Sequence, residues 1–392
     1  MKKILVVSNC SKRGTSTGLA GKFLDQLSKI DKQQFQIFLL DTSFNADGAK
    51  QSLYPVHSHF TLPKSIVRIL VRKIPGLRGI YGINMAIKTY KSLLKKYSFD
   101  WVVLYQVQPK ADQWTKIAHQ YNSKIAFVPW GSEVLRVSGK KQERLRIAFS
   151  EVDYVIGAEY ANTLLSARDV YSVPEIKLIY YKNYLKGVKL IGKVRDKYSR
   201  EEMMSSIGIP QSEYNILCGY NGYAGQNHKT IIDALNKNRN ILPKGYQLVF
   251  PITYGASDDY IEDLKAYCTQ LELKSVFITE YLTDEQVAFL HLVTDLFIQI
   301  QPTDDGNDFM KEALFAQNQI VTGRWLKYYQ FEQYGDPYYV IDTIEELPIM
   351  LSRIFSCEVP VPTVPSQLVE DMDSASETDN KLFWEKMFSD KF

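Results

Sequence analysis

Short apolar runs rich in β-branched residues alternate along this chain with longer segments of helical periodicity, and this alternation constrains the fold more than any other feature. A strand that rejoins its neighbour in the same direction needs a long crossover, usually a helix, so the pattern predicts parallel βαβ units. In the first part of the chain the predicted strands are 3–8, 36–40, 100–105, 124–129 and 153–157, and the predicted helices are 17–29, 84–96, 110–121 and 140–149.

A second series of the same kind follows a polar, lysine-rich stretch at 182–213, which we interpret as the inter-domain region. Its predicted strands are 215–220, 246–251, 275–279, 295–300 and 319–323, and its predicted helices are 228–237, 258–271, 283–292 and 307–317. The pattern and the length of 392 residues predict an α/β protein with two Rossmann-like, doubly wound parallel-sheet domains that face a central cleft. We place the domains at 1–185 and 186–375, and expect a closing helix within 376–392 to pack back on the first.

The composition excludes several classes of protein. The 47 Lys and Arg against 44 Asp and Glu leave a formal net charge of +3, too near balance for a protein that coats nucleic acid. The four scattered cysteines have neither a disulfide framework nor the spacing of zinc ligands. The N-terminal apolar run is too short for a signal peptide, and no stretch approaches the roughly 18 apolar residues of a spanning helix. We therefore expect a cytoplasmic protein that holds no metal.

The segment 295–323 is the most informative for function. A predicted strand ends at Ile300, an acidic loop follows, and a helix opens with free amides and a positive dipole end, an arrangement that binds phosphate. Glu312 on this helix would accept hydrogen bonds from both hydroxyls of a ribose, and Asp304, in the loop, would face a sugar beyond the phosphates. An ordinary capping loop is the alternative. The candidate donor-binding residues of this segment are Gly306, Asn307, Asp308, Phe309 and Glu312.

This segment resembles the nucleotide-sugar site of GT-B glycosyltransferases. DLFIQIQPTDDGNDFMKEALFAQNQIVTG is similar to the strand, acidic loop and Glu-Ala helix of the family 4 group, whose two acids have the spacing of Asp304 and Glu312. The segments NILCGYNGYAGQNHKTIIDAL, FPITYGASDDYIEDLKAYC and PWGSEVLRVS are more similar to the bacterial 4-acetamido-4,6-dideoxygalactose (Fuc4NAc) transferases of enterobacterial common antigen synthesis. The resemblance implies a GT-B fold and a nucleotide-sugar donor, UDP- or dTDP-linked, with no cofactor.

One feature of the family is missing from this chain. Many family 4 enzymes hold the pyrophosphate with an Arg and a Lys, where this chain has the neutral Asn221 and Gln226. The candidate replacements are the side chains of His228, Lys229, Arg324 and Lys327 and the backbone amides of Gly222 and Gly225. The missing pair leaves open a catalytically silent homologue that acts as partner or scaffold of another transferase, and a nucleotide-sugar epimerase is a further alternative.

Two elements of the first domain are candidates for substrate contact. In PWGSEV, Glu133 follows a predicted strand end and a glycine, so it is a candidate base for the acceptor proton if the reaction inverts configuration. If the reaction retains configuration, Glu133 orients the substrate; a plain helix start is the alternative. The loop 8–18 lacks the GxGxxG and Walker patterns. There Gly14 and Thr15 are candidate contacts for the donor phosphates, and an ordinary βα loop is the alternative.

The chain has no Asp or Glu between residues 48 and 99, and the basic segment 64–96 interleaves cationic with apolar residues. Pro75 and Gly76 divide it into two helical pieces, each typical of a helix that lies on an anionic membrane surface. A solvated basic helix face is the alternative, and no aromatic RNA-binding motif supports a nucleic-acid partner. The basic residues are Lys64, Arg68, Arg72, Lys73, Arg78, Lys88, Lys91, Lys95 and Lys96.

With the resemblance, these features predict a metal-independent glycosyltransferase of the hexosyltransferase type. We expect its acceptor to be lipid-linked or a polysaccharide, and the protein to associate peripherally with the cytoplasmic face of a bacterial membrane in cell-surface polysaccharide synthesis. The first domain would present the acceptor, and the second would bind the nucleotide-sugar.

Overall fold

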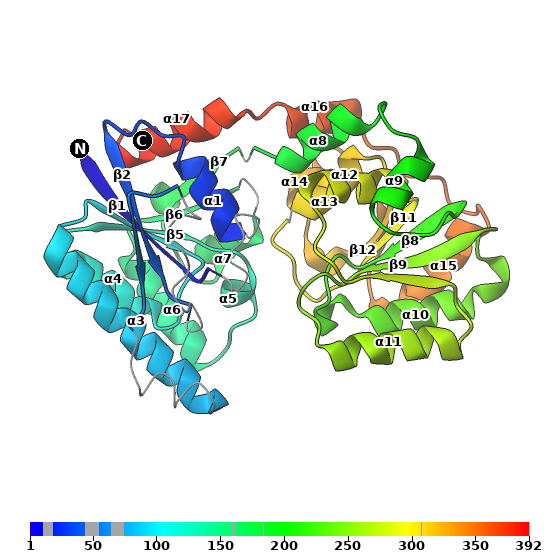
Figure 1. The fold of residues 1–392 in the computed structure, drawn as a ribbon, viewed down its shortest axis with the longest axis horizontal. Coiled ribbons are helices and arrows are strands. Elements are labelled where there is room, and N and C mark those ends of the chain that lie inside the picture. Colours follow the sequence, from blue (N-terminus) through cyan, green and yellow to red (C-terminus); the bar gives the residue numbers. More distant parts are fainter. Residues whose placement is uncertain are drawn as a thin grey trace. The chain divides into compact units, whose positions relative to one another are not determined.

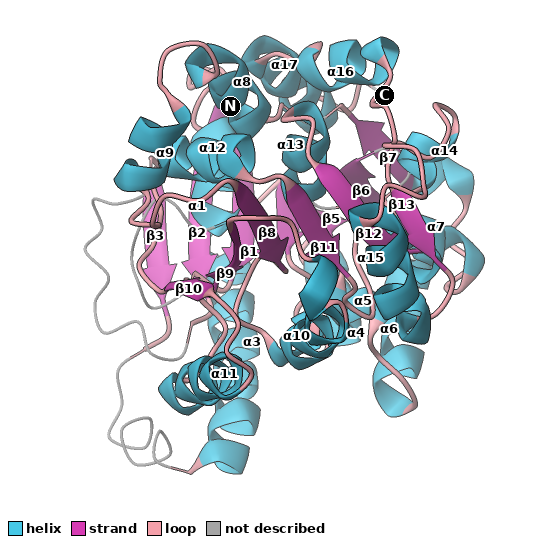
Figure 2. Ribbon diagram, turned by 90° about the vertical axis from the view of Figure 1, so that its right-hand side faces the viewer, coloured by secondary structure: helices cyan, strands magenta, loops and turns pink. Residues whose placement is uncertain are grey.

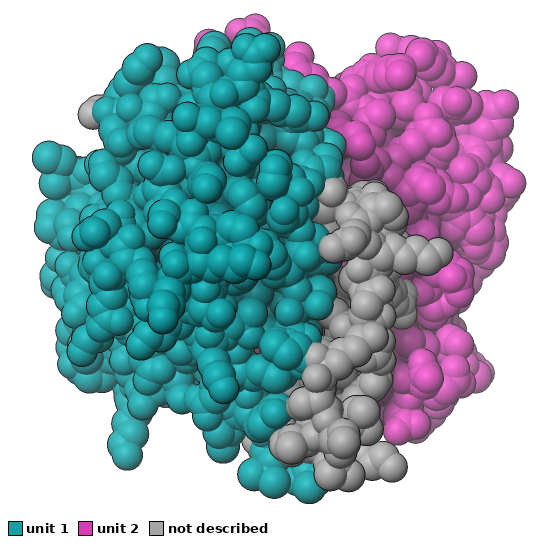
Figure 3. All heavy atoms as spheres, turned by 60° about the vertical axis from the view of Figure 1, so that its left-hand side comes forward, with its two compact units in different colours: residues 1–184, 376–392 teal, residues 185–375 magenta. Residues whose placement is uncertain are grey.

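The computed structural model describes residues 1–10, 19–43, 55–63, 74–158, 161–182, 184–306 and 308–391. They form two compact units, one from Met1–Tyr184 with Ser376–Phe392 and one from Leu185–Ala375 (Figures 1 and 3). In each unit a parallel sheet lies between two layers of helices (Figure 2), which is the predicted fold class. Of the candidates from the sequence, Gly14, Thr15, Asn307 and residues 64–73 of the basic segment lie outside the described residues.

The sheet of the first unit has the order β3-β2-β1-β4-β5-β6-β7 within the described residues, with all neighbours parallel. Its strands are β1 (Lys2–Ser8), β2 (Phe35–Asp41), β3 (Ser58–Thr61), β4 (Trp101–Tyr105), β5 (Lys124–Val128), β6 (Tyr154–Ala158) and β7 (Leu178–Tyr181). The sequence analysis missed β3 and β7. Both are edge strands of four residues with one buried residue each, so they lack the apolar run that marks the central strands.

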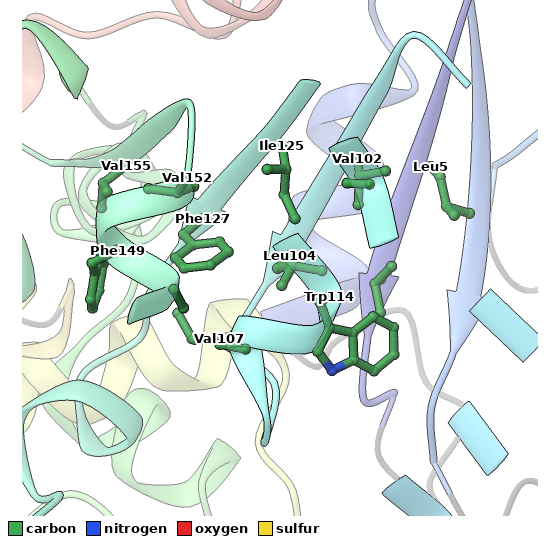
Figure 4. Close-up of a cluster of buried hydrophobic side chains, with 14 of the residues drawn as sticks. Leu5, Val102, Leu104, Val107, Trp114, Ile125, Phe127, Phe149, Val152 and Val155 are labelled. Atoms are coloured by element: carbon green, nitrogen blue, oxygen red, sulfur yellow. The ribbon is translucent and has the colours of Figure 1, made fainter. Parts of the chain in front are cut away.

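Alternate residues of β1 enter different cores of the first unit. Leu5 and Val7 join the side chains of one helical layer (Figure 4), whereas Ile4 and Val6 join those of the other. The first layer contains α3 (Pro75–Tyr97), α4 (Ala111–Gln120), α6 (Lys140–Glu151) and α7 (Asn162–Asp169), and the second contains α1 (Leu19–Leu27) and α17 (Glu377–Phe388). Trp384 of α17 is fully buried, and its ring centroid lies 5.2 Å from that of Phe23.

The sheet of the second unit has the order β10-β9-β8-β11-β12-β13 within the described residues, again all parallel. Its strands are β8 (Tyr214–Cys218), β9 (Tyr246–Pro251), β10 (Ser275–Ile278), β11 (Leu296–Gln299), β12 (Gln319–Gly323) and β13 (Tyr339–Ile341). The three residues of β13 were missed in the sequence. One helical layer contains α8 (Lys186–Val194), α9 (Arg200–Ser206), α12 (Asp284–Val293), α13 (Asp308–Phe315) and α16 (Ser366–Asp373); the other contains α10 (His228–Lys237), α11 (Asp258–Gln270) and α15 (Leu347–Phe355).

The lysine-rich stretch interpreted as an inter-domain region is largely helical. It forms α8 and α9, whose apolar residues are buried in the second unit. Val188, Ile191 and Val194 recur at helical spacing and are at most 1% exposed, so this stretch belongs to the core of that unit. Its lysines lie on the opposite face of α8, which explains why the composition alone resembled a linker.

The described part of the basic segment is α3, which Pro75 opens at a first-turn position (Figure 1). Its buried side includes Ala86, Tyr90, Leu93 and Leu94. Lysines at helical spacing occupy its exposed face: Lys88, Lys91, Lys95 and Lys96. None of the helices in the described ranges combines the length and apolar character needed to cross a membrane.

Candidate functional site

The strand order of the second unit reverses between β8 and β11, because the chain first builds outward from β8 to β10 and then returns to the other side of β8. In open α/β sheets ligands bind at such a switch point, beyond the carboxyl ends of the strands. The described segments that leave these strands are 219–227 and 300–306. Four of the candidate residues lie in these loops: Gly222, Gly225, Asp304 and Gly306.

Buried hydrogen bonds join these two loops. The Gln226 amide donates to Gln301 Oε1 at 2.6 Å, and Asn227 Nδ2 donates to the Ile300 carbonyl at 2.7 Å. Gln226 also accepts from the Tyr220 amide at 3.2 Å. Gly219 has φ +68°, and a Cβ there would lie 2.8 Å from Gln226 Oε1, so glycine is required for this close approach. Gln226 therefore acts as a neutral brace between the loops, at a position where many family 4 enzymes have a cation.

Gly222 joins the 219–227 loop to the loop that follows β9. Its amide donates to the Tyr254 carbonyl at 2.7 Å, and a Cβ would lie 2.6 Å from the Ala256 Cβ. In this structure the amide assigned to phosphate from the sequence is thus used within the protein. The role of Gly222 seen here is to let two loops touch.

His228 opens α10 and is completely buried. Its Nδ1 lies 3.1 Å from the Tyr260 hydroxyl, and its Nε2 has no hydrogen-bond partner among the described residues. Burial lowers the pKa of His228 to about 4. At this pKa the imidazole is neutral at neutral pH. The assignment of His228 to the donor site stays a prediction.

Two of the three exposed cations named as candidates, Lys229 and Arg324, have a carboxylate partner. Lys229 Nζ lies 2.6 Å from Asp263, and Arg324 Nε lies 2.6 Å from Asp342. Their side chains are 50% and 63% exposed, and exposed pairs of this kind contribute at most about 1 kcal/mol. An incoming phosphate can therefore replace either carboxylate at small cost.

Asp304 lies in the loop after β11 and is 8% exposed. Its Oδ2 accepts from the Tyr328 hydroxyl at 2.7 Å and from Gln299 Nε2 at 3.1 Å. Burial, together with the nearby Asp304 carboxylate, holds the pKa of Tyr328 well above its usual range, so the phenol remains a donor. Gly306, two residues later, has φ +72°, and a Cβ there would lie 2.7 Å from Gln330 Nε2.

The helix α13 supplies the remaining candidates of the second unit. Asp308 is its first residue, and Oδ1 lies 3.9 Å from Lys311 Nζ. The ring of Phe309 packs between His291 and Tyr220, with centroids 4.2 and 5.4 Å away, and fills space behind the loop. Glu312 is largely buried, at 12% side-chain exposure, and its Oε2 lies 3.1 Å from His291 Nε2.

Glu133 belongs to the first unit, in the short helix α5 (Ser132–Leu135) after β5. Its Oε1 accepts from the amides of Trp130 at 2.6 Å and Val107 at 3.4 Å. Its Oε2 is buried and has no hydrogen-bond partner among the described residues. Burial raises the pKa of this carboxyl, although the backbone hydrogen bonds oppose the change. A buried carboxylate with a raised pKa and a free oxygen has the chemistry of a general base.

Three exposed tyrosines that the sequence analysis did not use also lie beyond carboxyl ends of strands in the second unit. Tyr223, Tyr254 and Tyr281 follow β8, β9 and β10 and are 57%, 41% and 50% exposed. Ring centroids lie 6.1 Å apart for the first pair and 6.2 Å apart for the second. A tyrosine two or three residues after each of three consecutive predicted strands is the sequence signal that would have identified this aromatic row.

Among the described residues there is no group of three or more His, Cys, Asp or Glu that could hold a metal ion. The polar groups at the switch point of the second unit are instead amides, hydroxyls and carboxylates, among them Asp304, Asp308 and Glu312. This set suits hydrogen bonding to a sugar or a ribose.

The two parallel-sheet units give the chain the GT-B fold, which solved structures share over its whole length. A glycosyltransferase from Rickettsia africae matches with a TM-score of 0.67 and 14% identity, covering 100% of this chain and 98% of that one. HepE from Anabaena, in complex with UDP and glucose, matches with a TM-score of 0.66 and 13% identity, covering 100% of both chains. The UDP-GlcNAc 2-epimerase from Methanocaldococcus jannaschii matches with a TM-score of 0.58 and 12% identity, covering 99% of this chain and 100% of that one.

No protein-family model matches the sequence, and a search of curated proteins finds no match to it. The similarity to the solved structures establishes the fold and leaves the activity to be argued from the residues. The Fuc4NAc transferase resemblance stays a prediction.

Proposed function

We propose that this protein is a glycosyltransferase that takes its sugar from a UDP- or dTDP-linked donor bound to the second unit. The observation that carries the proposal is the pair of carboxylates, Asp304 and Glu312, held by buried hydrogen-bond donors on either side of the N-terminus of α13. This arrangement offers a carboxylate to a sugar, helix amides to phosphate and a second carboxylate to a ribose. HepE, a solved structure of the same fold, binds UDP and glucose.

The aromatic row supports a nucleotide as the ligand. Every base has an aromatic face, and stacking on a tyrosine contributes about 1–3 kcal/mol per base. Tyr223 and Tyr254 are held in place because Gly222 and Gly255 leave no gap between their loops. A rigid, exposed aromatic surface beside polar loops suits a ligand that has one apolar end and one charged end, such as a nucleotide.

For the chemical step we propose that Glu133 is the base. It removes the proton from the acceptor hydroxyl while that oxygen forms the bond to the anomeric carbon and the bond to the nucleoside diphosphate breaks. The negative charge of the leaving diphosphate is stabilised by backbone amides at the start of α13 and by Lys229 or Arg324. No step requires a metal, so turnover is expected to persist in EDTA; activity lost in EDTA and restored by Mn²⁺ would contradict this assignment.

We propose a lipid-linked or polysaccharide acceptor at the cytoplasmic face of a bacterial membrane, with α3 as the contact surface. Its four exposed lysines, at about 1 kcal/mol each near an anionic surface, provide reversible attachment. Flotation with vesicles that contain phosphatidylglycerol tests this. The variant with Lys88, Lys91, Lys95 and Lys96 replaced by Gln should stay in the lower fraction, and unchanged flotation would refute the role of α3.

Two alternatives have a specific observation in their favour. The fold is shared with a UDP-GlcNAc 2-epimerase, and an epimerase would convert its nucleotide-sugar without any acceptor. The neutral residues Asn221 and Gln226 favour a catalytically silent partner of another transferase, which would bind no nucleotide. Incubating the protein with UDP-sugars alone, followed by chromatography of the products, distinguishes the epimerase from the transferase.

The first test is calorimetric titration with UDP, dTDP and GDP. We expect one diphosphate to bind and Glu312→Gln to weaken it tenfold or more, about 1.4 kcal/mol. Glu262→Gln is the matched control, because Glu262 lies on α11 with its side chain 72% exposed. If no diphosphate binds to the wild type, the silent-partner alternative replaces this proposal.

A further inference from the structure

The carboxylate of Glu312 is fixed from one side by His291. The two residues lie on neighbouring helices, α13 and α12, and His291 Nε2 is 3.1 Å from Glu312 Oε2. The His291 ring is completely buried and packs against Phe309. A ring held in this way cannot turn without disturbing the core between the helices.

The surroundings of His291 also define where its proton lies. A ring nitrogen that faces a carboxylate oxygen must carry hydrogen to form a hydrogen bond. The other nitrogen, Nδ1, is buried and has no hydrogen-bond partner among the described residues, so a proton there would be a buried unsatisfied donor. The tautomer that satisfies both conditions carries its single proton on Nε2, directed at Glu312.

The second oxygen of Glu312, Oε1, lies close to the backbone of Gly187, which has no side chain. Gly187 lies in the first turn of α8, and a Cβ built there would be 1.9 Å from Glu312 Oε1. Only glycine therefore allows the carboxylate to lie against this turn, where the positive end of the helix dipole favours an anion. The two oxygens therefore face two different helices, with a hydrogen-bonding partner on α12 and close backbone on α8.

We propose that His291 and Gly187 are positioning residues, which hold the Glu312 carboxylate in the orientation that receives the ribose hydroxyls of the donor. This inference rests on the proposed function of Glu312. A glutamate free to rotate would lose that freedom each time a nucleotide binds, whereas a carboxylate already ordered by its neighbours does not. The cost of ordering the side chain is met during folding.

Gly187→Ala is the sharpest test, because Gly192→Ala in the same helix is its matched control. A Cβ at Gly192 would meet only Phe315, at the ordinary distance of 3.8 Å. Alanine favours helix over glycine at both positions, so thermal stability should not fall through helix propensity. We expect Gly187→Ala to weaken binding of the diphosphate tenfold or more and Gly192→Ala to leave it unchanged, both by calorimetry.

His291 is tested by a rescue and a double-mutant cycle. His291→Phe keeps an aromatic ring but removes the donor, and His291→Gln restores an N–H near the place of Nε2. We expect tenfold weaker binding for the first and affinity within threefold of the wild type for the second. In a protein that already carries Glu312→Gln, the further change His291→Phe should cause no additional loss of diphosphate affinity. The reason is that His291 affects binding only through the Glu312 carboxylate. Independent, multiplying losses would overturn the proposal.

A measurement without ligand separates the two proposals. In ¹H–¹⁵N spectra of the histidine rings, identified by comparison with His291→Phe, we expect a slowly exchanging Nε2–H signal that shifts in Glu312→Gln. If this signal is absent, or if nucleotide binds equally well to wild type, Gly187→Ala and His291→Phe, the positioning role is refuted while the donor site survives. If the wild type binds no nucleotide, the donor site itself is refuted and the positioning role with it.

Discussion

Lowering the pH should destabilise this protein through His228, and the variant His228→Asn should remove that part of the effect. The imidazole is buried at the start of α10, and burial lowers its pKa from 6.5 to about 4. Below pH 6.5 the unfolded chain therefore binds a proton at this position that the folded chain does not accept until about pH 4. Stability is lost across this window as the pH falls, and the loss levels off below it.

The size of the effect follows from the shift. A difference of about 2.5 pKa units corresponds to about 3 kcal/mol, at about 1.4 kcal/mol per unit. Asparagine retains a polar atom near the place of Nδ1, which lies 3.1 Å from the Tyr260 hydroxyl. The packing lost in His228→Asn lowers the unfolding free energy by the same amount at every pH. The difference in unfolding free energy between wild type and His228→Asn should therefore move by about 3 kcal/mol in favour of the variant between pH 7 and pH 4.

Urea unfolding followed by circular dichroism at intervals of half a pH unit measures this difference, and NMR titration of the imidazole gives the pKa directly. His119→Asn is the control, because the His119 side chain is 41% exposed. Parallel stability curves for wild type and His228→Asn, or a titration of His228 near pH 6.5, would refute the reasoning. Either result would also restore His228 as a possible cation at the donor site.

Three further predictions concern other parts of the site. Glu133→Gln should lower turnover at least a hundredfold, within the usual range for loss of a general base, while calorimetry finds nucleotide affinity unchanged; retained turnover would exclude it as the base. Tyr328→Phe should lower the unfolding free energy by about 1.5–3 kcal/mol in urea, because a buried carboxylate loses its phenolic donor, whereas the exposed Tyr329→Phe should change it little. Gly222→Ala should cost about 1–3 kcal/mol by overpacking two loops, and Gly225→Ala, whose Cβ would meet only one atom at 3.9 Å, should cost less in thermal unfolding.

The fold was predictable because its central strands and its helices can be recognised from short stretches of sequence. Each central strand is an apolar run that is buried on both faces, as in β1, where residues on both sides of the sheet are covered. The edge strands β3, β7 and β13 have at most two buried residues each, and their pairing depends on a neighbour that sequence order does not reveal. The lysine-rich stretch was misinterpreted for the same reason, since only packing shows that α8 buries its apolar side.

The placement of the candidate residues at strand ends and helix starts was predictable, because these can be read from the sequence, whereas their role as a donor site stays a prediction. The partners of these residues could not be predicted. Asp304 meets Tyr328 and Glu312 meets His291 across 24 and 21 residues, through contacts that depend on how α12, α13 and the loop after β12 pack. The unusual pKa of His228 likewise arises from burial, which spacing does not encode.

Under the proposed function, these contacts would allow a donor site to lack the Arg and Lys of many family 4 enzymes. A cationic side chain raises the affinity of a site for phosphate through its charge. Fixed dipoles raise this affinity because they are already ordered before the ligand binds. Gln226 is braced by Gln301, and the loops of Gly219 and Gly222 are closed by contacts that only glycine permits. Under the proposed function, nucleotide binding would therefore depend on the rigidity of these loops rather than on cationic side chains.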